Sequence, residues 1–112
     1  GSVIAYDNSV KKDILGVSPD IINNYGAVSR ETVELMAEGA RSLLKTDYSV
    51  ATSGIAGPDG GTESKPVGTV WIAVSSRTGT LSEKHLYGTD RIANINRFSV
   101  AALNLLWKQI SK

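Results

Sequence analysis

The sequence predicts an α/β fold, with a three-layer α/β/α domain built on a mixed β-sheet. In the first half, short apolar runs typical of strands alternate with segments of helical periodicity. In the second half, two strand patterns are joined by a short turn that contains glycine. We therefore expect parallel strands early in the chain and an antiparallel hairpin late. The 112 residues, of which 41% are hydrophobic, suffice for one domain with a single core.

The first part of the chain is predicted to hold one short strand and two short helices. Residues 3–6 form an apolar run typical of a buried strand. A cluster of N-cap residues follows and predicts a helix over residues 9–15. Ser18 as the cap and Pro19 in the first turn predict a second helix start. Each of these two helices is followed by a glycine that can end it, Gly16 after the first and Gly26 after the second.

Two longer helices are predicted from apolar stripes at a period of 3.6 residues. Ser29 is the expected cap of a helix over residues 30–45, and Thr89-Asp90 begins a last helix over residues 91–110. The stripe of the first comprises Val33, Met36, Ala37, Ala40, Leu43 and Leu44. The stripe of the second comprises Ile92, Ile95, Phe98, Ala102, Leu103, Leu106 and Ile110.

Three further strands are predicted, over residues 48–52, 68–76 and 80–87. The last two form a hairpin, because residues 77–79 end in a glycine suited to a positive φ. In the middle strand of the three, apolar side chains alternate with others, so we expect one of its faces to be the better core face. That face carries Val70, Ile72 and Val74.

A glycine-rich loop over residues 53–66 follows the first of these strands. Its four glycines let the backbone approach a ligand closely and direct several N–H groups inward, which suits a phosphate or an oxyanion. The same composition also fits a long connection made of turn residues, and both interpretations stand. The loop is neither a Walker A motif nor a dinucleotide-binding fingerprint. The glycines are Gly54, Gly57, Gly60 and Gly61.

Few other side chains could take part in catalysis or ligand binding. Lys11 and Lys12 follow Tyr6 closely, and a lysine there is either a base of lowered pKa or an ordinary surface residue. Arg91 either meets a phosphate or pairs with the adjacent acid. His85 is the one histidine, and its alternation with a polar neighbour predicts a surface position.

Composition excludes several classes of function. The formal net charge is +1, so total charge indicates no nucleic-acid partner. No apolar run approaches the roughly 20 residues of a membrane span, which predicts no membrane partner and a cytoplasmic protein. The absence of cysteine excludes disulfides and thiolate catalysis. The carboxylates show no metal-ligand spacing, so no metal site is expected.

Several ordered strings carry a resemblance over essentially the whole chain. They include Ile-Ala-Tyr-Asp-Asn at 4–8 followed by Lys11, Gly-Ala-Val-Ser at 26–29, Met-Ala-Glu-Gly-Ala at 36–40, Ser-Gly-Ile-Ala-Gly-Pro-Asp-Gly-Gly at 53–61 and Gly-Thr-Asp-Arg at 88–91. Together they resemble the CinA C-terminal domain family, whose members also occur alone as nicotinamide-nucleotide amidases. The resemblance implies an α/β/α fold and the hydrolysis of nicotinamide mononucleotide to nicotinate mononucleotide and ammonia.

The resemblance also implies roles for individual residues, without a metal or an organic cofactor. The family's mechanism is thought to use a serine nucleophile assisted by a tyrosine and a lysine. The tyrosine falls on Tyr6 and the lysine on Lys11, with Lys12 as the alternative if the register is shifted by one. The expected substrate-binding residues are Ser53, Gly54, Gly57, Gly60, Gly61 and Arg91.

The sequence departs from the family pattern in one respect that matters for catalysis. The Glu-Ser-Cys-Thr-Gly-Gly-type string that carries the nucleophile is absent. We therefore expect residues 1–112 to be a single domain that lacks its N-terminal helix segment, with the serine upstream. Asp59 replaces a usual glycine, and Ser53 stands where a threonine is common.

Two other readings of the chain remain open. The domain could be a non-catalytic nucleotide-binding or interaction module of a longer competence/damage-inducible protein. It could also form a homodimer, because the last helix is apolar on more than one side. The residues that suggest the homodimer are Leu103, Leu105, Leu106 and Trp107. The expected small-molecule partner is a nucleotide substrate.

Overall fold

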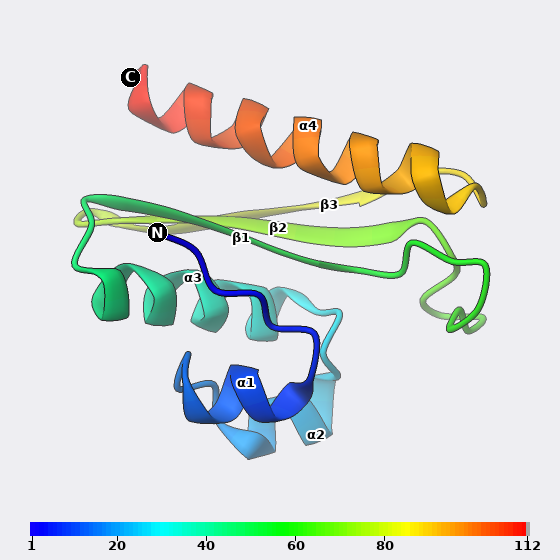
Figure 1. Cartoon of the computed structure of the whole chain (residues 1–112), viewed down its shortest axis with the longest axis horizontal. Helices are drawn as coiled ribbons and strands as arrows, with labels where there is room; N and C mark the ends of the chain where they lie inside the picture. Colours follow the sequence, from blue (N-terminus) through cyan, green and yellow to red (C-terminus); the bar gives the residue numbers. More distant parts are fainter. Residues whose placement is uncertain (112) are drawn as a thin grey trace.

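The computed structural model describes residues 1–111, which form four helices and three strands (Figure 1). Every predicted helix and three of the four predicted strands are present, with ends shifted by at most two residues. In chain order the elements are α1 (Asn8–Asp13), α2 (Pro19–Tyr25), α3 (Arg30–Leu44), β1 (Tyr48–Gly54), β2 (Thr69–Ser76), β3 (Gly79–Leu86) and α4 (Arg91–Ile110). None of these helices is long and apolar enough to cross a membrane.

The sheet of the described residues is wholly antiparallel, in the order β1-β2-β3. Val50 of β1 faces Val74 of β2, and Ile72 of β2 faces Glu83 of β3. The predicted hairpin is therefore confirmed, whereas the predicted parallel strands are wrong for this part of the chain. The physical reason is that β1 and β2 are connected by a loop and not by a crossover helix, so β2 runs back along β1.

Helices pack on both faces of this sheet, with α3 on one face and α4 on the other (Figure 1). The central strand β2 is consequently buried on both faces, and its predicted core face lies against α4. The α4 side of the core contains Val70, Ile72, Val74, Phe98, Ala102 and Leu105. The α3 side contains Leu15, Val17, Ile22, Val33, Met36, Ala37, Ala51 and Ala73. Each cluster excludes water from one face of the sheet.

Residues 3–6 do not form the predicted strand. They pair with no strand, and the carbonyl of Ala5 accepts a hydrogen bond from the side chain of Lys11. Val3 and Ala5 still pack on the α3 side of the core, which explains the apolar pattern. An apolar run alone cannot distinguish such a segment from a strand, because a strand also needs a neighbouring backbone to pair with.

The predicted stripe of α4 is partly wrong. Phe98 and Ala102 are buried as expected, but Ile92 is 73% exposed and Leu103 is 62% exposed. The buried face is completed instead by Asn94 and Leu105. Because α4 carries apolar side chains around more than one face, its periodicity alone could not select the face that meets the sheet.

The turn after α1 packs closely against a glycine in the middle of α3. A Cβ atom at Gly39 would lie 1.9 Å from the carbonyl oxygen of Leu15, which belongs to the turn after α1. Gly16 continues that turn with φ of 72°, a conformation that glycine adopts without strain. Gly39 therefore lets the backbone of this turn lie directly on the helix.

We expect Gly39→Ala to destabilise the protein by about 1–3 kcal/mol, because the clash with the Leu15 carbonyl displaces the turn. The gain in helix propensity, about 1 kcal/mol, does not offset this displacement. Urea unfolding followed by circular dichroism measures the change. Ser42→Ala, at an exposed position of the same helix, is the matched control and should change stability by less than about 0.5 kcal/mol. A Gly39→Ala variant as stable as the parent would contradict the packing argument.

Candidate functional site

Lys11 is the most unusual titratable residue among those described. Its side chain is 6% exposed, and its ammonium donates a hydrogen bond of 2.9 Å to the carbonyl oxygen of Ala5. Burial lowers the pKa of Lys11 below its ordinary value, and the negative charge of Asp7 opposes this shift. A desolvated lysine releases its proton more readily than a surface lysine, which is what a general base requires.

Local structure explains why Lys11 and not Lys12 is buried. Asp7 caps α1 by accepting a hydrogen bond from the backbone N–H of Ser9, and this bond is the main cause of the lowered pKa of Asp7. Lys11 then lies one turn into the helix, on the side that faces residues 3–6. Lys12 is only half-buried, and the ring of Tyr6 is 94% exposed. Of the predicted catalytic pair, Lys11 is thus enclosed and Tyr6 is open to solvent.

Backbone hydrogen bonds join the two ends of the glycine-rich loop where it leaves the sheet. The N–H of Ile55 donates to Thr69, and the N–H of Gly68 donates to Ile55, so the β1–β2 ladder closes the loop at its base. Two side chains then attach the loop to the segment between α2 and α3. The hydroxyl of Ser53 donates a hydrogen bond to the carbonyl of Ala27 at 2.7 Å. The ammonium of Lys65 donates one to the carbonyl of Tyr25, the last residue of α2, at 2.6 Å.

The beginning of α4 holds the loop from its other side. The guanidinium of Arg91 donates to the carbonyl of Gly57 at 2.7 Å. The side-chain amide of Asn94 donates to the carbonyls of Ala56 and Gly88, each at 2.9 Å. In the structure Arg91 therefore meets a backbone carbonyl, while Asp90 caps α4 by accepting from the N–H of Ile92.

Asn94 is the residue of this site that the sequence interpretation missed. It is fully buried and joins three separate segments of the backbone. Asn94 lies outside the apolar stripe predicted for α4, so the sequence pattern gave no signal for its burial. Lys65 was missed as well, since nothing local indicates that its ammonium meets the end of α2.

The loop glycines have distinct structural requirements. Gly57 and Gly60 have φ of 95° and 94°, which favours glycine at both positions. A Cβ atom at Gly54 would lie 2.8 Å from Phe98, and one at Gly61 would lie 2.7 Å from the backbone nitrogen of Val67. The glycines thus serve the loop's own conformation and packing.

A cavity of about 760 Å³ lies along the free edge of β1, between α3 and α4. Residues 1–6 border it, including Tyr6, together with Met36 and Ala40 of α3 and Ala102 and Leu106 of α4. Neither Lys11 nor any residue of the loop at 54–61 is part of its lining. Of the predicted site residues, this cavity therefore includes Tyr6 alone.

The sequence pattern of the CinA C-terminal domain matches residues 1–110. The chain belongs to this family. A CinA-like protein from Cytophaga hutchinsonii is 45% identical over 112 residues, which cover 100% of this chain and 27% of that protein. The nicotinamide-nucleotide amidohydrolase PncC of Shewanella oneidensis is 56% identical over 81 residues, which cover 72% of this chain and 19% of that protein.

Solved structures show the same relationship. The competence/damage inducible protein CihA from Agrobacterium tumefaciens is 39% identical with a TM-score of 0.86, over 93% of this chain and 64% of that one. The competence damage-inducible protein A from Klebsiella pneumoniae is 29% identical with a TM-score of 0.91, over 97% of this chain and 68% of that one. The chain spans about a quarter of the length of the Cytophaga relative.

We expect Asn94→Asp to destabilise the protein by at least about 2 kcal/mol, because a carboxylate oxygen replaces the N–H₂ group that faces two carbonyl oxygens in a buried place. Urea unfolding measures the loss. Asn96→Asp, an exposed change on the same helix, is the control and should alter stability by less than about 0.5 kcal/mol. Equal stability of the two variants would show that Asn94 does not hold the loop.

The lowered pKa of Lys11 predicts how stability depends on pH. Between its folded pKa and the ordinary value of 10.5, the unfolded chain binds more protons than the folded one. The contribution of Lys11 to stability therefore rises as pH increases through this window. Comparing the unfolding free energies of the parent and Lys11→Met at pH 7 and pH 10 tests this. The difference should shift in favour of the parent at pH 10, whereas a shift toward Lys11→Met would contradict the assignment.

Proposed function

We propose that this domain is the amidohydrolase module of a CinA-type protein and converts nicotinamide mononucleotide and water to nicotinate mononucleotide and ammonia. The observation that carries the proposal is the desolvated ammonium of Lys11. It is supported by membership of the family and by the name of the Shewanella oneidensis relative. In this proposal the nucleophilic serine comes from protein residues outside the sequence given, and Lys11 is its base.

The proposed reaction proceeds in two steps. The serine hydroxyl attacks the carboxamide carbon, and neutral Lys11 accepts its proton, with Tyr6 orienting or relaying it. Lys11 returns the proton to the leaving nitrogen, so that ammonia departs and an acyl-enzyme remains. Water then attacks the same carbon and Lys11 accepts a proton from it. Lys11 passes this proton to the departing serine oxygen, so the acid is released and both the serine hydroxyl and neutral Lys11 are restored. No metal or organic cofactor enters this scheme.

The loop and its flanking residues are proposed to bind the nucleotide. Backbone N–H groups of this loop, those of Gly54, Gly57, Gly60 and Gly61, would form an oxyanion hole or a phosphate cradle. Arg91 can keep its bond to Gly57 and still reach a phosphate, because a guanidinium has five N–H donors. Ser53 has one O–H, which is bonded to Ala27, so donating to a phosphate would require giving up that bond.

The experiment is ammonia release from nicotinamide mononucleotide by the natural full-length protein that contains this chain. Lys11→Met should lower kcat at least about 100-fold, because it removes the general base. Lys12→Met is the matched control and should retain most of the activity, since the side chain of Lys12 is less buried. Circular dichroism checks that both variants are folded.

The alternative function is a non-catalytic nucleotide-binding module. One observation favours it. Within residues 1–111 the hydrogen-bond partner of the Lys11 ammonium is the Ala5 carbonyl, and not a hydroxyl that Lys11 could deprotonate. Saturable binding of nicotinamide mononucleotide without ammonia release would support this alternative and refute the amidase. Equal activity of Lys11→Met and the parent would remove Lys11 from the mechanism.

A further inference from the structure

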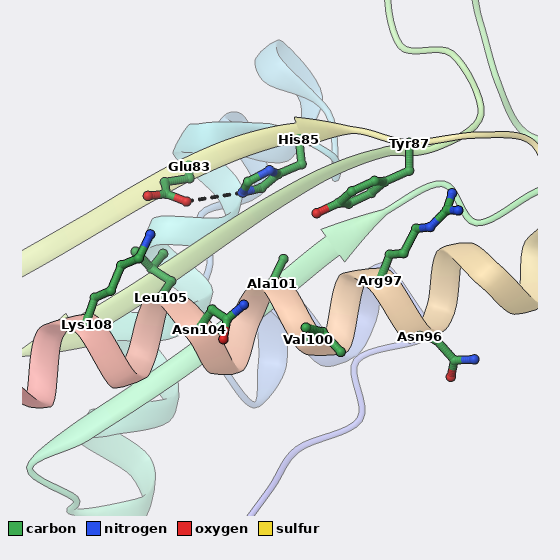
Figure 2. A pocket seen from close by; sticks show the side chains of 10 residues that line it. All are labelled: Glu83, His85, Tyr87, Asn96, Arg97, Val100, Ala101, Asn104, Leu105 and Lys108. Carbon is green, nitrogen blue, oxygen red and sulfur yellow. Dashed lines mark hydrogen bonds and ion pairs between the residues drawn. The ribbon is translucent and has the colours of Figure 1, made fainter.

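A second cavity, of about 340 Å³, lies between β3 and α4, on the α4 side of the sheet (Figure 2). It is separate from residues 5–11 and from the glycine-rich loop. Strand β3 contributes alternate residues to one wall, and α4 contributes the opposite wall and the base. The lining residues are Glu83, His85, Tyr87, Asn96, Arg97, Val100, Ala101, Asn104, Leu105 and Lys108.

The strand side of this cavity presents two aromatic rings. The rings of His85 and Tyr87 lie with their planes 6° apart and their centroids 5.7 Å apart. The ring of Tyr87 also lies near that of Phe98 of α4, at a centroid distance of 6.1 Å. The two rings extend from β3 toward the helix, where Val100, Ala101 and Leu105 supply an apolar base (Figure 2). Such a surface favours a planar apolar group.

The ends of the cavity carry positive charge. The Arg97 guanidinium carbon lies 5.9 Å from the centroid of the Tyr87 ring, and Lys108 borders the opposite end (Figure 2). Within residues 1–111 neither Arg97 nor Lys108 forms an ion pair with a carboxylate. The one acid of the lining, Glu83, is already engaged by His85 at 3.1 Å. The cavity therefore has two cations free to meet an anion.

We infer that this cavity binds a small aromatic monocarboxylate. The ring of the ligand would lie against the apolar base beside Tyr87 and His85, and its carboxylate would meet Arg97, whose planar fork suits bidentate pairing. The side-chain amides of Asn96 and Asn104 offer further donors at the rim. A volume of about 340 Å³ matches a single-ring ligand better than a whole nucleotide. This inference does not depend on the proposed amidase activity.

The test is a titration of the ¹⁵N-labelled protein with benzoate, followed by heteronuclear NMR. Benzamide, which has the same shape without the charge, is the matched control ligand. We expect saturable shifts of the backbone amides of His85, Tyr87 and Ala101 with benzoate, and about tenfold weaker binding of benzamide. Arg97→Gln should weaken benzoate binding about tenfold and leave benzamide binding unchanged.

Two further variants keep the result interpretable. Arg77→Gln, in the β2–β3 turn and outside the lining, should bind benzoate as the parent does. Lys108→Gln tests the second cation, should Arg97→Gln disturb the Tyr87 ring. Equal affinity for benzoate and benzamide, no saturable shift at the cavity, or shifts that follow protein concentration instead of benzoate would each overturn the inference. The last of these outcomes would indicate that a second copy of the chain covers the cavity.

Discussion

The burial of β2 on both faces is the constraint on which the rest of the structure depends. Residues on both faces of this strand are at most 1% exposed, among them Thr69, Ile72 and Ser75. Two of these three carry a hydroxyl group. This is achieved because α3 covers one face and α4 covers the other (Figure 1). Central strands buried in this way lose the alternation of polar and apolar residues that marks a half-exposed strand. Both long helices are thereby fixed relative to the sheet.

That arrangement also fixes the glycine-rich loop. The loop spans the connection from β1 to β2, so its base is set by the central pair of strands. Asn94 and Arg91 hold it from α4, on one side of the sheet, and Ser53 holds it to the turn before α3, on the other. Hydrogen bonds to segments on both sides of the sheet thereby hold this long irregular connection in place.

The elements themselves could be predicted from the sequence, because their signals are local. Capping residues, terminal glycines and the hairpin turn located all four helices and the three strands of the sheet. The segment at 3–6 and the exposed face of α4 could not be predicted in this way. Whether an extended run pairs, and which face of an all-round apolar helix is covered, depends on neighbours that are distant in the sequence.

The sequence by itself determined the family and the order of the four helices and the three sheet strands, because motifs and periodicities are properties of residue order. It proposed Lys11 and the glycine-rich loop as site residues, and these roles stay predictions. Only the tertiary structure decided that Lys11 is buried while Tyr6 is exposed, that Arg91 meets the Gly57 carbonyl, and that Asn94 ties the loop to α4. The physical reason is that burial and hydrogen-bond partners arise from segments brought together by packing.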